Sequence, residues 1–440
     1  MITEMDANRF ATRRLQDPRL LRILAAAINA VDPYKAVQKY LPELSGRVFG
    51  LGVGKAAIPM MDALAERIPL SNGLAVCKHA SGLRRDLYTV IEGGHPIPDE
   101  RSLNAGTRVL EFVSSLKEDD TLVCLISGGG SALVTAPYVP LEDLQTLTSL
   151  LLASGARIDE INTLRRQLDR VKGGGLARAT KARIVSLILS DVIGNPLEAI
   201  ASGPTVPDPT TSEDALAILR KYGIDEQVPF SILNLLSSTV LRDAGVRSHP
   251  HANEEIVSSV SDLLAMIRIQ NIIIGDNTLA AQAALEQATA EGFHAEILTN
   301  ELQGEAREVG VTLAKRLHDE ATKRPRPFCL IAGGETTVTL MGNGKGGRNQ
   351  ELALAAVNEL RDVGKVLLVS LATDGDDGPT DAAGAVVTGE TARVSESLGL
   401  DAAGSLSRND AYPFFEALGD LLQPRPTGTN VNDLIFLFAT

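Results

Sequence analysis

The sequence predicts an α/β protein with two domains. Its 440 residues, 44% of them hydrophobic, are enough to bury two sizeable cores. Strand-like runs of β-branched and apolar residues alternate with stretches of helical periodicity along most of the chain, which is typical of parallel sheets with crossover helices. A proline-rich segment, residues 203–253, interrupts this alternation, and we expect the domain junction near residues 245–253. The expected domains are therefore residues 1–248 and 249–440.

The N-terminal half is expected to hold a sheet whose strands each run into a turn or a glycine cluster. The expected strands are residues 48–53, 74–78, 122–127 and 184–189. Helices are expected around them at residues 18–31, 56–67, 103–116 and 141–153, and the last of these places four leucines on one face.

The C-terminal half repeats the alternation. Strands are expected at residues 271–275, 295–298, 329–332, 337–341, 366–372 and 434–438. Helices are expected at residues 278–291, 304–322 and 349–360.

Charge and composition exclude several classes of protein. The chain carries 42 basic and 55 acidic residues, and its net charge of −13 argues against nucleic-acid or anionic-membrane binding, because a polyanion needs a basic surface. No apolar run reaches the ~18 residues of a membrane helix, and the polar N-terminus lacks the apolar core of a secretory signal. Cys77, Cys124 and Cys329 lie far apart in strand-like runs, as buried reduced thiols do. We therefore expect a soluble cytoplasmic protein; a homo-oligomer is compatible with the sequence, which does not fix the oligomeric state.

Glycine-rich turns after expected strands point to a phosphate ligand. Two of them, residues 126–131 and 331–336, lie in opposite halves of the chain, and a third, residues 342–351, adds Lys345 and Arg348. Glycine permits positive φ angles and a close approach of backbone N–H groups to a phosphate at a strand end. The pattern predicts phosphate binding between two lobes.

The turn after the first expected strand places a cation beside such donors. It contains Gly52, Gly54 and Lys55, with Lys55 at the start of the next helix. The spacing resembles a dinucleotide fingerprint, but the acidic residue expected about 20 positions later is missing. It is not a P-loop either, because the first glycine of that motif is absent and Ala56 replaces its Ser or Thr.

Residues 162–177 place four cations ahead of three consecutive glycines. Arg165 and Arg170 fit a solvated helix face as well as an anion site. Three glycines carry an entropic cost on folding, so they are expected to serve the close approach of a ligand or of a second chain segment.

Polar side chains follow two of the expected strands. Ser190 and Asp191 come directly after residues 184–189, and Asp374 opens an acidic turn after residues 366–372. A carboxylate at the carboxyl end of a strand is placed to be a metal ligand or a general base, and one or two suffice for Mg²⁺ beside phosphates. Each could equally be an Asx turn or a helix cap.

In these motifs the chain resembles the class II glycerate 2-kinases, whose C-terminal part is the MOFRL domain. The motifs are G-x-G-K-A-A, S-G-G-G-S-A-L, N-x-x-R-x-x-L-x-x-V-K-G-G-G-L-A, L-S-D-V-x-G-x-x-x-x-x-I-A-S-G-P-T, G-G-E-x-T-V, G-x-G-x-G-G-R-N-Q-E and T-D-G-x-D-G-x-T-D-A-A-G-A. Because seven unrelated motifs occur in the family's order over residues 23–434, the resemblance is specific and covers nearly the whole chain.

The resemblance implies a Rossmann-like N-terminal lobe with a parallel sheet, a C-terminal α/β lobe with a mixed sheet, and ATP and glycerate bound in the cleft between them. The implied reaction is phosphorylation of D-glycerate by ATP, with Mg²⁺, to 2-phosphoglycerate. The family's catalytic lysine and arginine fall on Lys55 and Arg348; we add Asp191 as a catalytic residue, and Asp374 with Asp191 as metal ligands. The residues expected to bind substrate or nucleotide are Gly52, Gly54, Ser127, Gly128, Gly129, Gly130, Ser131, Arg165, Lys172, Gly173, Gly174, Ser190, Gly333, Gly334, Glu335, Thr336, Gly346, Gly347, Asn349 and Asn430.

Two other functions stay open. Members of the family were also labelled hydroxypyruvate reductases, which use NAD(P)H, and a non-catalytic sensor of phosphorylated metabolites would need the same anion site. The missing ribose-binding acid and the acidic turn at Asp374 favour the kinase.

Overall fold

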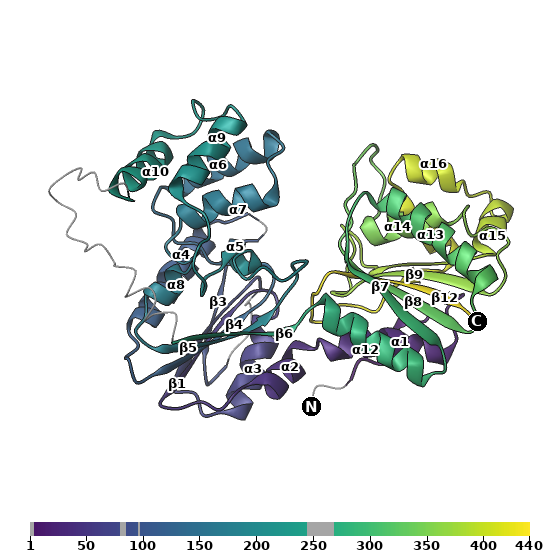
Figure 1. The fold of residues 1–440 in the computed structure, drawn as a ribbon, viewed down its shortest axis with the longest axis horizontal. Coiled ribbons are helices and arrows are strands. Elements are labelled where there is room, and N and C mark those ends of the chain that lie inside the picture. Colours follow the sequence, from purple (N-terminus) through teal and green to yellow (C-terminus); the bar gives the residue numbers. More distant parts are fainter. Residues whose placement is uncertain (1–3, 80–84, 96, 244–267) are drawn as a thin grey trace. The chain divides into compact units, whose positions relative to one another are not determined.

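The computed structural model describes residues 4–79, 85–95, 97–243 and 268–440. The chain forms two compact units (Figure 1). The first, here called the parallel-sheet unit, contains Val37–Leu189 and Asn195–Ile274. The second, here called the mixed-sheet unit, contains Met1–Ala36, Ser190–Gly194 and Gly275–Thr440.

The parallel-sheet unit is built on six strands in the order β3-β2-β1-β4-β5-β6. The strands are β1 (Val48–Val53), β2 (Asn72–Cys77), β3 (Thr89–Glu92), β4 (Thr121–Ile126), β5 (Arg183–Leu189) and β6 (Ile269–Gly275). β1 pairs in parallel with both β2 and β4, so the turns that follow β1 and β4 leave the same edge of the sheet side by side. The four strands expected in this half are confirmed, and β3 was not expected.

Helices pack on both faces of this sheet. They are α2 (Pro33–Tyr40), α3 (Ala57–Arg67), α4 (Glu100–Ser114), α5 (Gly130–Leu133) and α8 (Gly175–Arg178), with a 3-10 turn η2 (Ile200–Ser202). Met61 of α3 packs over Gly50, whereas Phe112 of α4 meets Phe49, the next residue along β1. Because successive side chains of a strand point to opposite faces, α3 and α4 cover opposite faces of the sheet.

Four further helices form a layer with a core of its own (Figure 1). They are α6 (Leu141–Ala153), α7 (Ile158–Gln167), α9 (Ser212–Lys221) and α10 (Phe230–Asp243). Leu147, Leu164, Leu219 and Ile232 are among the buried side chains of this core. Arg166 of α7 donates a hydrogen bond of 3.4 Å to the carbonyl of Glu198, in the loop before η2. The layer thereby holds α7 and its arginines in a fixed position relative to η2.

The mixed-sheet unit has six strands in the order β11-β10-β9-β12-β8-β7. The strands are β7 (His294–Leu302), β8 (Phe328–Gly334), β9 (Val366–Ala372), β10 (Gly384–Thr388), β11 (Leu421–Leu422) and β12 (Asp433–Ala439). Only β7 and β8 pair in parallel, and the other neighbours are antiparallel. The predicted mixed sheet and the α/β class of both halves are confirmed.

Helices also cover both faces of the mixed sheet, as Figure 1 shows. They are α12 (Asn277–Ala290), α13 (Ala306–Lys323), α14 (Arg348–Ala356), α15 (Thr391–Ser397), α16 (Ala402–Ser407) and α17 (Ala411–Leu418), together with η1 (Ala7–Phe10) and α1 (Pro18–Ala30) from the N-terminus. The core between α13, α14, α17 and the sheet includes Leu313, Phe328, Leu352 and Phe415.

The N-terminal segment belongs to the mixed-sheet unit, which corrects the expected division into residues 1–248 and 249–440. α1 packs against α12, where Arg22 forms an ion pair of 2.6 Å with Glu291. Arg14 is bonded to Asp420 by its backbone N–H at 3.0 Å and by its guanidinium group. The sequence shows an amphipathic helix at residues 18–30 but not its partner α12, because the residues that meet there are far apart in sequence, Arg22 and Glu291 being separated by 269 positions.

Two further expectations need correction. Residues 271–275, expected in the second domain, belong to β6 of the parallel sheet. Residues 337–341 were expected to be a strand, but only Thr337 forms an isolated bridge, to Glu305, and the residues after it have no regular structure. The expected junction at residues 245–253 lies outside the described residues. Among the described helices, none is both long and apolar enough to cross a membrane.

Candidate active site

The turns after β1 and β4 are bonded to each other and bring Lys55 beside a glycine cluster. The N–H of Lys55 donates to the carbonyl of Gly128 at 2.9 Å, and the N–H of Ala56 donates to Oγ of Ser127 at 3.0 Å. Gly54 has φ +126°, and a Cβ there would lie 2.3 Å from Oγ of Ser127, so only glycine permits this approach. The Lys55 side chain is exposed at the carboxyl edge of the sheet, where ligands bind in open α/β folds.

The turn after β4 offers backbone donors at the same edge. Within the described residues, the N–H groups of Gly128 and Gly129 have no hydrogen-bond acceptor, although Gly128 is buried. Buried N–H groups in proteins are almost always satisfied, so these two are available to a ligand oxygen. Ser127 and Ser131 serve the turn itself: Oγ of Ser127 accepts from Ala56, and Oγ of Ser131 lies 2.8 Å from Oγ of Ser202.

The missing side chains of Gly52 and Gly130 are explained by packing within the protein. A Cβ at Gly52 would lie 2.7 Å from Cγ of Met61 on α3. A Cβ at Gly130 would lie 2.9 Å from Cβ of Ala201. Both were expected to bind substrate or nucleotide, but their missing side chains make room for the protein.

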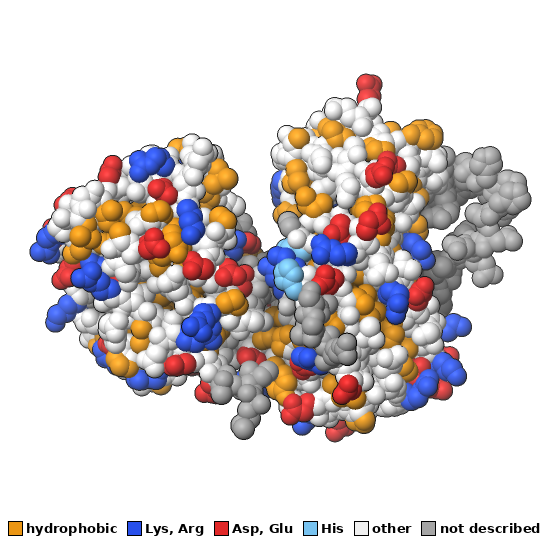
Figure 2. All heavy atoms as spheres, turned by 180° about the vertical axis from the view of Figure 1, so that it is seen from behind, with side chains coloured by type: hydrophobic (Ala, Val, Ile, Leu, Met, Phe, Trp, Pro, Cys, Tyr) orange, Lys and Arg blue, Asp and Glu red, His pale blue; other side chains and the backbone are white. Residues whose placement is uncertain are grey.

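His95 is a member of this cluster that the sequence analysis missed. It follows β3, and its Nε2 lies 3.1 Å from the position that a Cβ on Gly129 would occupy, while Cγ of Lys55 lies 3.4 Å from the same position. Burial, and then the positive charges of Lys55 and Lys78, hold the pKa of His95 below its usual value. Figure 2 shows histidine atoms at the surface beside Lys and Arg side chains. The sequence signal was Gly93-Gly94-His95 after a short strand, another glycine turn of the same kind.

Lys172 is a buried structural cation. Its Nζ donates to Oδ2 of Asp169 at 2.7 Å, to the carbonyl of Val134 at 3.0 Å and to Oγ1 of Thr135 at 3.3 Å. Its three protons therefore meet three acceptors of the protein, and its exposed fraction is 3%. Burial lowers the pKa of Lys172, against the opposing effect of the Asp169 charge. Lys172 was expected to bind a ligand, and in the structure its ammonium group is engaged by these three acceptors of the protein.

The three glycines after Lys172 bring two chain segments together. Gly173 and Gly174 have φ +54° and +79°, and their N–H groups donate to the carbonyls of Ser202 at 2.9 Å and Gly203 at 2.7 Å. The sequence left open a ligand or a second chain segment, and the structure shows the second chain segment.

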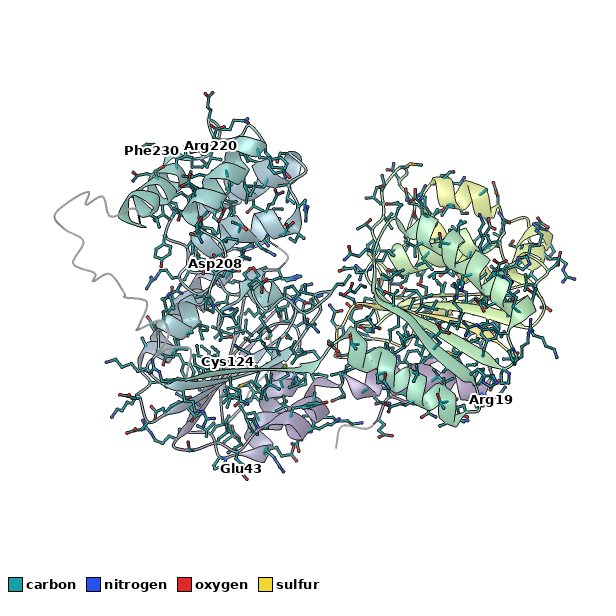
Figure 3. All side chains as sticks on the ribbon, in the orientation of Figure 1. Arg19, Glu43, Cys124, Asp208, Arg220 and Phe230 are labelled. Atoms are coloured by element: carbon teal, nitrogen blue, oxygen red, sulfur yellow. The ribbon has the colours of Figure 1, made fainter. Side chains whose placement is uncertain are left out.

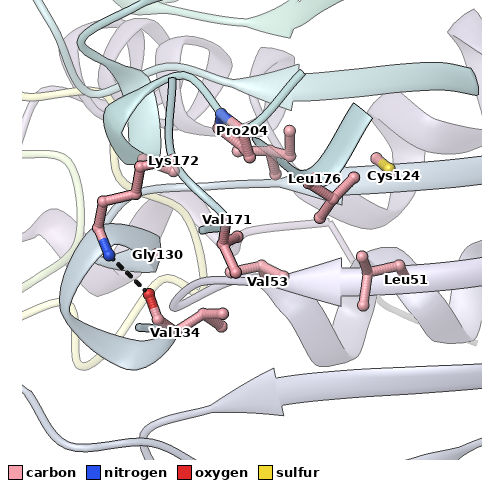
Figure 4. A pocket seen from close by; sticks show the side chains of 11 residues that line it. Leu51, Val53, Cys124, Gly130, Val134, Val171, Lys172, Leu176 and Pro204 are labelled. Carbon is pink, nitrogen blue, oxygen red and sulfur yellow. Dashed lines mark hydrogen bonds between the residues drawn. The ribbon is translucent and has the colours of Figure 1, made fainter. Parts of the chain in front are cut away.

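A small cavity adjoins Lys172 (Figure 4). It is lined mostly by apolar side chains, including Leu51, Val134 and Leu176, and its volume of about 20 Å³ has room for about one water molecule. Figure 4 shows the Lys172 ammonium group turned to the Val134 carbonyl. The cavity is too small for a nucleotide, so it is not the ligand site.

Arg165 differs from its neighbour Arg166 in having no acidic partner in the part of the chain that the structure describes. Arg166 is buried and forms an ion pair of 2.7 Å with Asp208, which is labelled in Figure 3. Arg165 is half-buried, and the nearest acceptor among the described residues is Oδ1 of Asn162, at 3.5 Å from its Nη1. Burial lowers the pKa of Arg165, with no acidic group nearby to oppose it. A partly desolvated guanidinium group without a counter-charge is suited to bind an anionic ligand.

In the mixed-sheet unit, Arg348 is held by two carboxylates at the start of α14. Its Nε and Nη2 donate to the two oxygens of Asp433 at 2.6 and 3.0 Å, and its Nη1 donates to Glu335 at 2.5 Å. Burial opposes the charged form, but the hydrogen bond and charge of Asp433 outweigh it and raise the pKa of Arg348. Arg348 is thus a fixed cation, and Glu335, expected to bind a ligand, positions it.

Asp377 fixes the start of the same helix. Its carboxylate oxygens accept the N–H groups of Asn349 at 3.1 Å and Gln350 at 2.9 Å. A Cβ on Gly347 would lie 2.3 Å from Cγ of Asp377, so Gly347 is needed for this contact. Asn349 is buried and accepts a hydrogen bond from Ser370, and Gly346 lies against Ala411. Gly346, Gly347 and Asn349 therefore shape the protein around Arg348.

The glycine cluster at the end of β8 is also a packing feature. A Cβ on Gly333 would lie 1.7 Å from Oδ1 of Asn277 on α12, so Gly333 packs directly under that side chain. Gly334 lies against the backbone of Leu302. Thr336 is buried. This cluster resembles residues 128–130 in sequence, but its missing side chains face the protein.

Ser190 and Asp191 follow β5 of the parallel sheet, and Asp374 follows β9 of the mixed sheet, while all three residues belong to the mixed-sheet unit. Ser190 is buried and its Oγ accepts the N–H of Val192 at 3.2 Å, while Oδ1 of Asp374 accepts the N–H of Asp376 at 3.2 Å. Asn430 accepts the N–H of Asn432. The contact of Asp374 is a turn of the structural kind that the sequence analysis kept as an alternative, and Ser190 and Asn430 make similar local contacts.

The carboxylates were tested as a metal site. In the described part of the chain, no group of three or more His, Cys, Asp or Glu side chains is arranged to hold a metal ion. Mg²⁺ bound with a nucleotide needs only one or two carboxylates besides water and phosphate oxygens. The half-buried carboxylates of Asp191 and Asp374 are hard oxygen donors of that kind, so the residues present fit Mg²⁺.

Comparison with known proteins identifies the family. The MOFRL family matches residues 328–433, and a domain of unknown function, DUF4147, matches residues 19–237. A D-glycerate 2-kinase from Thermotoga maritima is 44% identical, with 95% of this chain and 98% of the relative covered. This chain belongs to the glycerate 2-kinase family.

Other relatives and a solved structure agree on the fold. A glycerate 2-kinase from Pyrococcus horikoshii is 40% identical, and 96% of each chain is covered. The crystal structure of the Thermotoga maritima glycerate kinase has a TM-score of 0.84 at 42% identity, covering 95% of this chain and 98% of that one. A relative from Agrobacterium vitis, 38% identical over 94% of this chain and 92% of its own, has a name that suggests, without asserting it, hydroxypyruvate reductase activity.

Proposed function

We propose that this protein is a glycerate 2-kinase that transfers the γ-phosphoryl group of ATP to the 2-hydroxyl of D-glycerate, giving 2-phosphoglycerate and ADP. The observation that carries the chemistry is the pair of N–H groups without acceptors at Gly128 and Gly129, beside the exposed Lys55. Phosphoryl transfer requires little covalent help from the protein; it requires positioning and neutralisation of phosphate charge. Bare amides and a fixed cation supply both.

Each of the three cations has a role in this proposal. Lys55 and the turn at residues 128–130 bind phosphate oxygens. Arg165, which lacks an acidic partner among the described residues, binds the carboxylate of glycerate, for which a guanidinium group has two parallel donors. Arg348, fixed by Asp433 and Glu335, neutralises charge that develops on the transferred phosphoryl group.

Asp191 and Asp374 would hold Mg²⁺ in this reaction. When bound with the nucleotide, Mg²⁺ neutralises charge on the phosphates. A cytoplasmic location is part of the same proposal and is supported by the three buried free cysteines, of which Cys124 is labelled in the sheet in Figure 3.

The reductase reading has less support from the structure. A dinucleotide site of the usual kind needs an acidic residue for the ribose after the second strand. β2 ends at Cys77, and Lys78 and His79 follow it, so no acid stands there. The positive charge of Lys78 at this position does not suit a ribose hydroxyl acceptor and instead favours a phosphate ligand.

One coupled assay tests the proposal. Purified protein is offered D-glycerate, L-glycerate or hydroxypyruvate with ATP and Mg²⁺, or with NADH, and the phosphorylated product is identified by ³¹P NMR. We expect ADP formation with D-glycerate and a 2-phosphoglycerate signal. Oxidation of NADH by hydroxypyruvate, without ATP use that depends on glycerate, would refute the kinase; nucleotide binding with neither reaction would indicate a sensor.

A further inference from the structure

His95 stands at the reacting end of the parallel sheet. It lies three residues beyond β3 (Thr89–Glu92), which is parallel to β2, as β2 is to β1 and β1 to β4. The chain therefore leaves β3 at the same edge of the sheet as Lys55 after β1 and residues 128–130 after β4. No part of the phosphate-binding role assigned above uses His95.

The imidazole and the Lys55 side chain meet over one residue. Nε2 and Cδ2 of His95 lie 3.1 and 3.2 Å from the position of a Cβ on Gly129, and Cγ of Lys55 lies 3.4 Å from it. Gly129 has φ +83°, so glycine is favoured there both by its backbone and by the two side chains that pack above it. A ligand that accepts the N–H of Gly129 lies within reach of both side chains.

The surroundings of the ring keep it neutral and open. The charged groups that face it are Lys55 from the turn after β1 and Lys78 from the end of β2, and the turn after β4 presents only Gly129. Burial and these two cations hold the pKa of His95 below its usual value, so the ring is unprotonated at neutral pH. Within the described residues, neither ring nitrogen takes part in a hydrogen bond, so a nitrogen lone pair is available.

The carboxylates considered above are less suited to accept a proton at this turn. Oδ1 of Asp374 already accepts the N–H of Asp376, and Asp191 has contacts of its own. Asp169 is buried and paired with Lys172. His95 is therefore the neutral acceptor of this cluster.

We propose that His95 is the general base of the reaction and takes the proton of the attacking hydroxyl through Nε2. The inference rests on the proposed glycerate kinase function. The 2-hydroxyl oxygen of glycerate forms a bond to the γ-phosphorus, the bond from that phosphorus to the β–γ bridging oxygen breaks, and its electron pair leaves with ADP. The hydroxyl proton passes to Nε2, and the imidazolium then releases it to water. Lys55 stays protonated and binds the phosphate oxygens.

The test combines substitution with a pH profile. His95→Gln keeps a polar side chain of similar length but cannot take the proton, and we expect kcat to fall about 10²- to 10⁴-fold with a smaller change in the KM for ATP. In the wild type, kcat falls on acidification below the pKa of His95, and this fall is absent from the variant. The titration of the nucleotide itself is common to both enzymes and cancels in the ratio of their rates.

Two measurements separate a catalytic from a structural role. Added imidazole should restore part of the activity of His95→Ala, which a change of fold would not allow. NMR titration of the histidine ring in the wild type should show a pKa below 6.5 that rises when Lys55 is changed to Met, because one of the two cations is then gone. His318→Gln, which changes an exposed histidine on α13, is the matched control and should leave kcat unchanged.

The outcomes are distinguishable. If the wild type forms no 2-phosphoglycerate, the proposed function fails and the role of His95 fails with it. If the wild type is active and His95→Gln retains kcat within about threefold with the same pH profile, only the role of His95 is refuted. Should His95→Gln fail to fold, the activity of His95→Asn and the NMR titration of the wild type still test the role of His95. A ring that is protonated at pH 7 cannot be the base.

Discussion

Replacing Lys172 by Met tests whether the buried cation beside the glycine cluster is structural. The change keeps the length of the side chain and removes its charge, leaving Asp169 buried at 4% exposure without its 2.7 Å partner. Removing one member of a buried ion pair typically costs about 3–5 kcal/mol. Asp169 retains hydrogen bonds from the hydroxyl of Thr135 and the N–H groups of Ala136 and Val171, so we expect the lower end, about 3 kcal/mol.

The loss should appear in the unfolding of the parallel-sheet unit. For a unit of this size about 3 kcal/mol corresponds to a fall in Tm of about 6–12 °C, measurable by calorimetry and by urea unfolding. Arg170→Met, an exposed cation two positions away, is the matched control and should change the free energy of unfolding by less than about 0.5 kcal/mol. Asp169→Asn in the Lys172→Met background should recover part of the loss, because the unpaired charge is then gone.

The opposite result would refute this reasoning. If Lys172→Met unfolded like the wild type but bound ATP or glycerate at least tenfold more weakly, Lys172 would be a ligand contact, as the sequence motif implied. In that case the buried pair in the structure would be broken when the ligand binds.

Four other outcomes follow from the charges of the site. Lys55→Ala should lower kcat by about 10²- to 10³-fold with an unchanged Tm, because the side chain is exposed; an unchanged kcat would contradict its role. Arg348→Ala should lower both kcat and Tm, because Asp433 is left buried without its partner, and adding Asp433→Asn should restore Tm but not kcat. Arg165→Met should raise the KM for glycerate by about 10- to 100-fold without lowering Tm, since it removes a cation that has no acidic partner in the described structure; a fall in Tm would show a structural role. Burial raises the pKa of Asp377 to about 7, so the native state keeps a proton between about pH 4 and 7 that the unfolded chain has lost. The free energy of unfolding should therefore fall as pH rises through this window, and Asp377→Asn should flatten the fall between urea unfolding at pH 5 and at pH 8.

The sequence predicted most of the fold because most of its elements carry a local signal. β1, β4, β5, β8, β9 and β12 are apolar runs that end at a glycine or a polar turn, and α1, α6 and α12 have a regular apolar face or an Asp cap. The edge strands β3 and β11 are only four and two residues long, too short to show a periodic pattern, and were missed. Residues 337–341 have the composition of a strand, yet no neighbour in the sheet is available to pair with them beyond Thr337. The placement of α1 and β6 depends on contacts distant in sequence, which no local pattern contains.

The candidate site was predicted in part for the same physical reason. A glycine in sequence signals that a side chain would be obstructed, but it does not say by what. At Gly333 the obstruction is Asn277, at Gly347 it is Asp377, and at Gly52 it is Met61, so three of the predicted binding glycines make room for the protein. At Gly128 and Gly129 the N–H groups have no acceptor within the described residues, and there the prediction of a ligand stays supported.

The cations of the candidate site differ in the number of hydrogen-bond acceptors that each already has within the protein. Lys172 has three, and Arg348 has two carboxylates that leave it fixed but still half-buried. Lys55 has no ion-pair partner in the described structure and is exposed, and Arg165 has only a long contact to an amide oxygen. A sequence motif gives all four the same weight, since each lies beside glycine or in a basic run. Lys55 and Arg165, whose charges are not compensated among the described residues, gain the most free energy by binding an anionic substrate. Arg348 is instead held in place by its two carboxylates, ready for the charge that develops during the transfer.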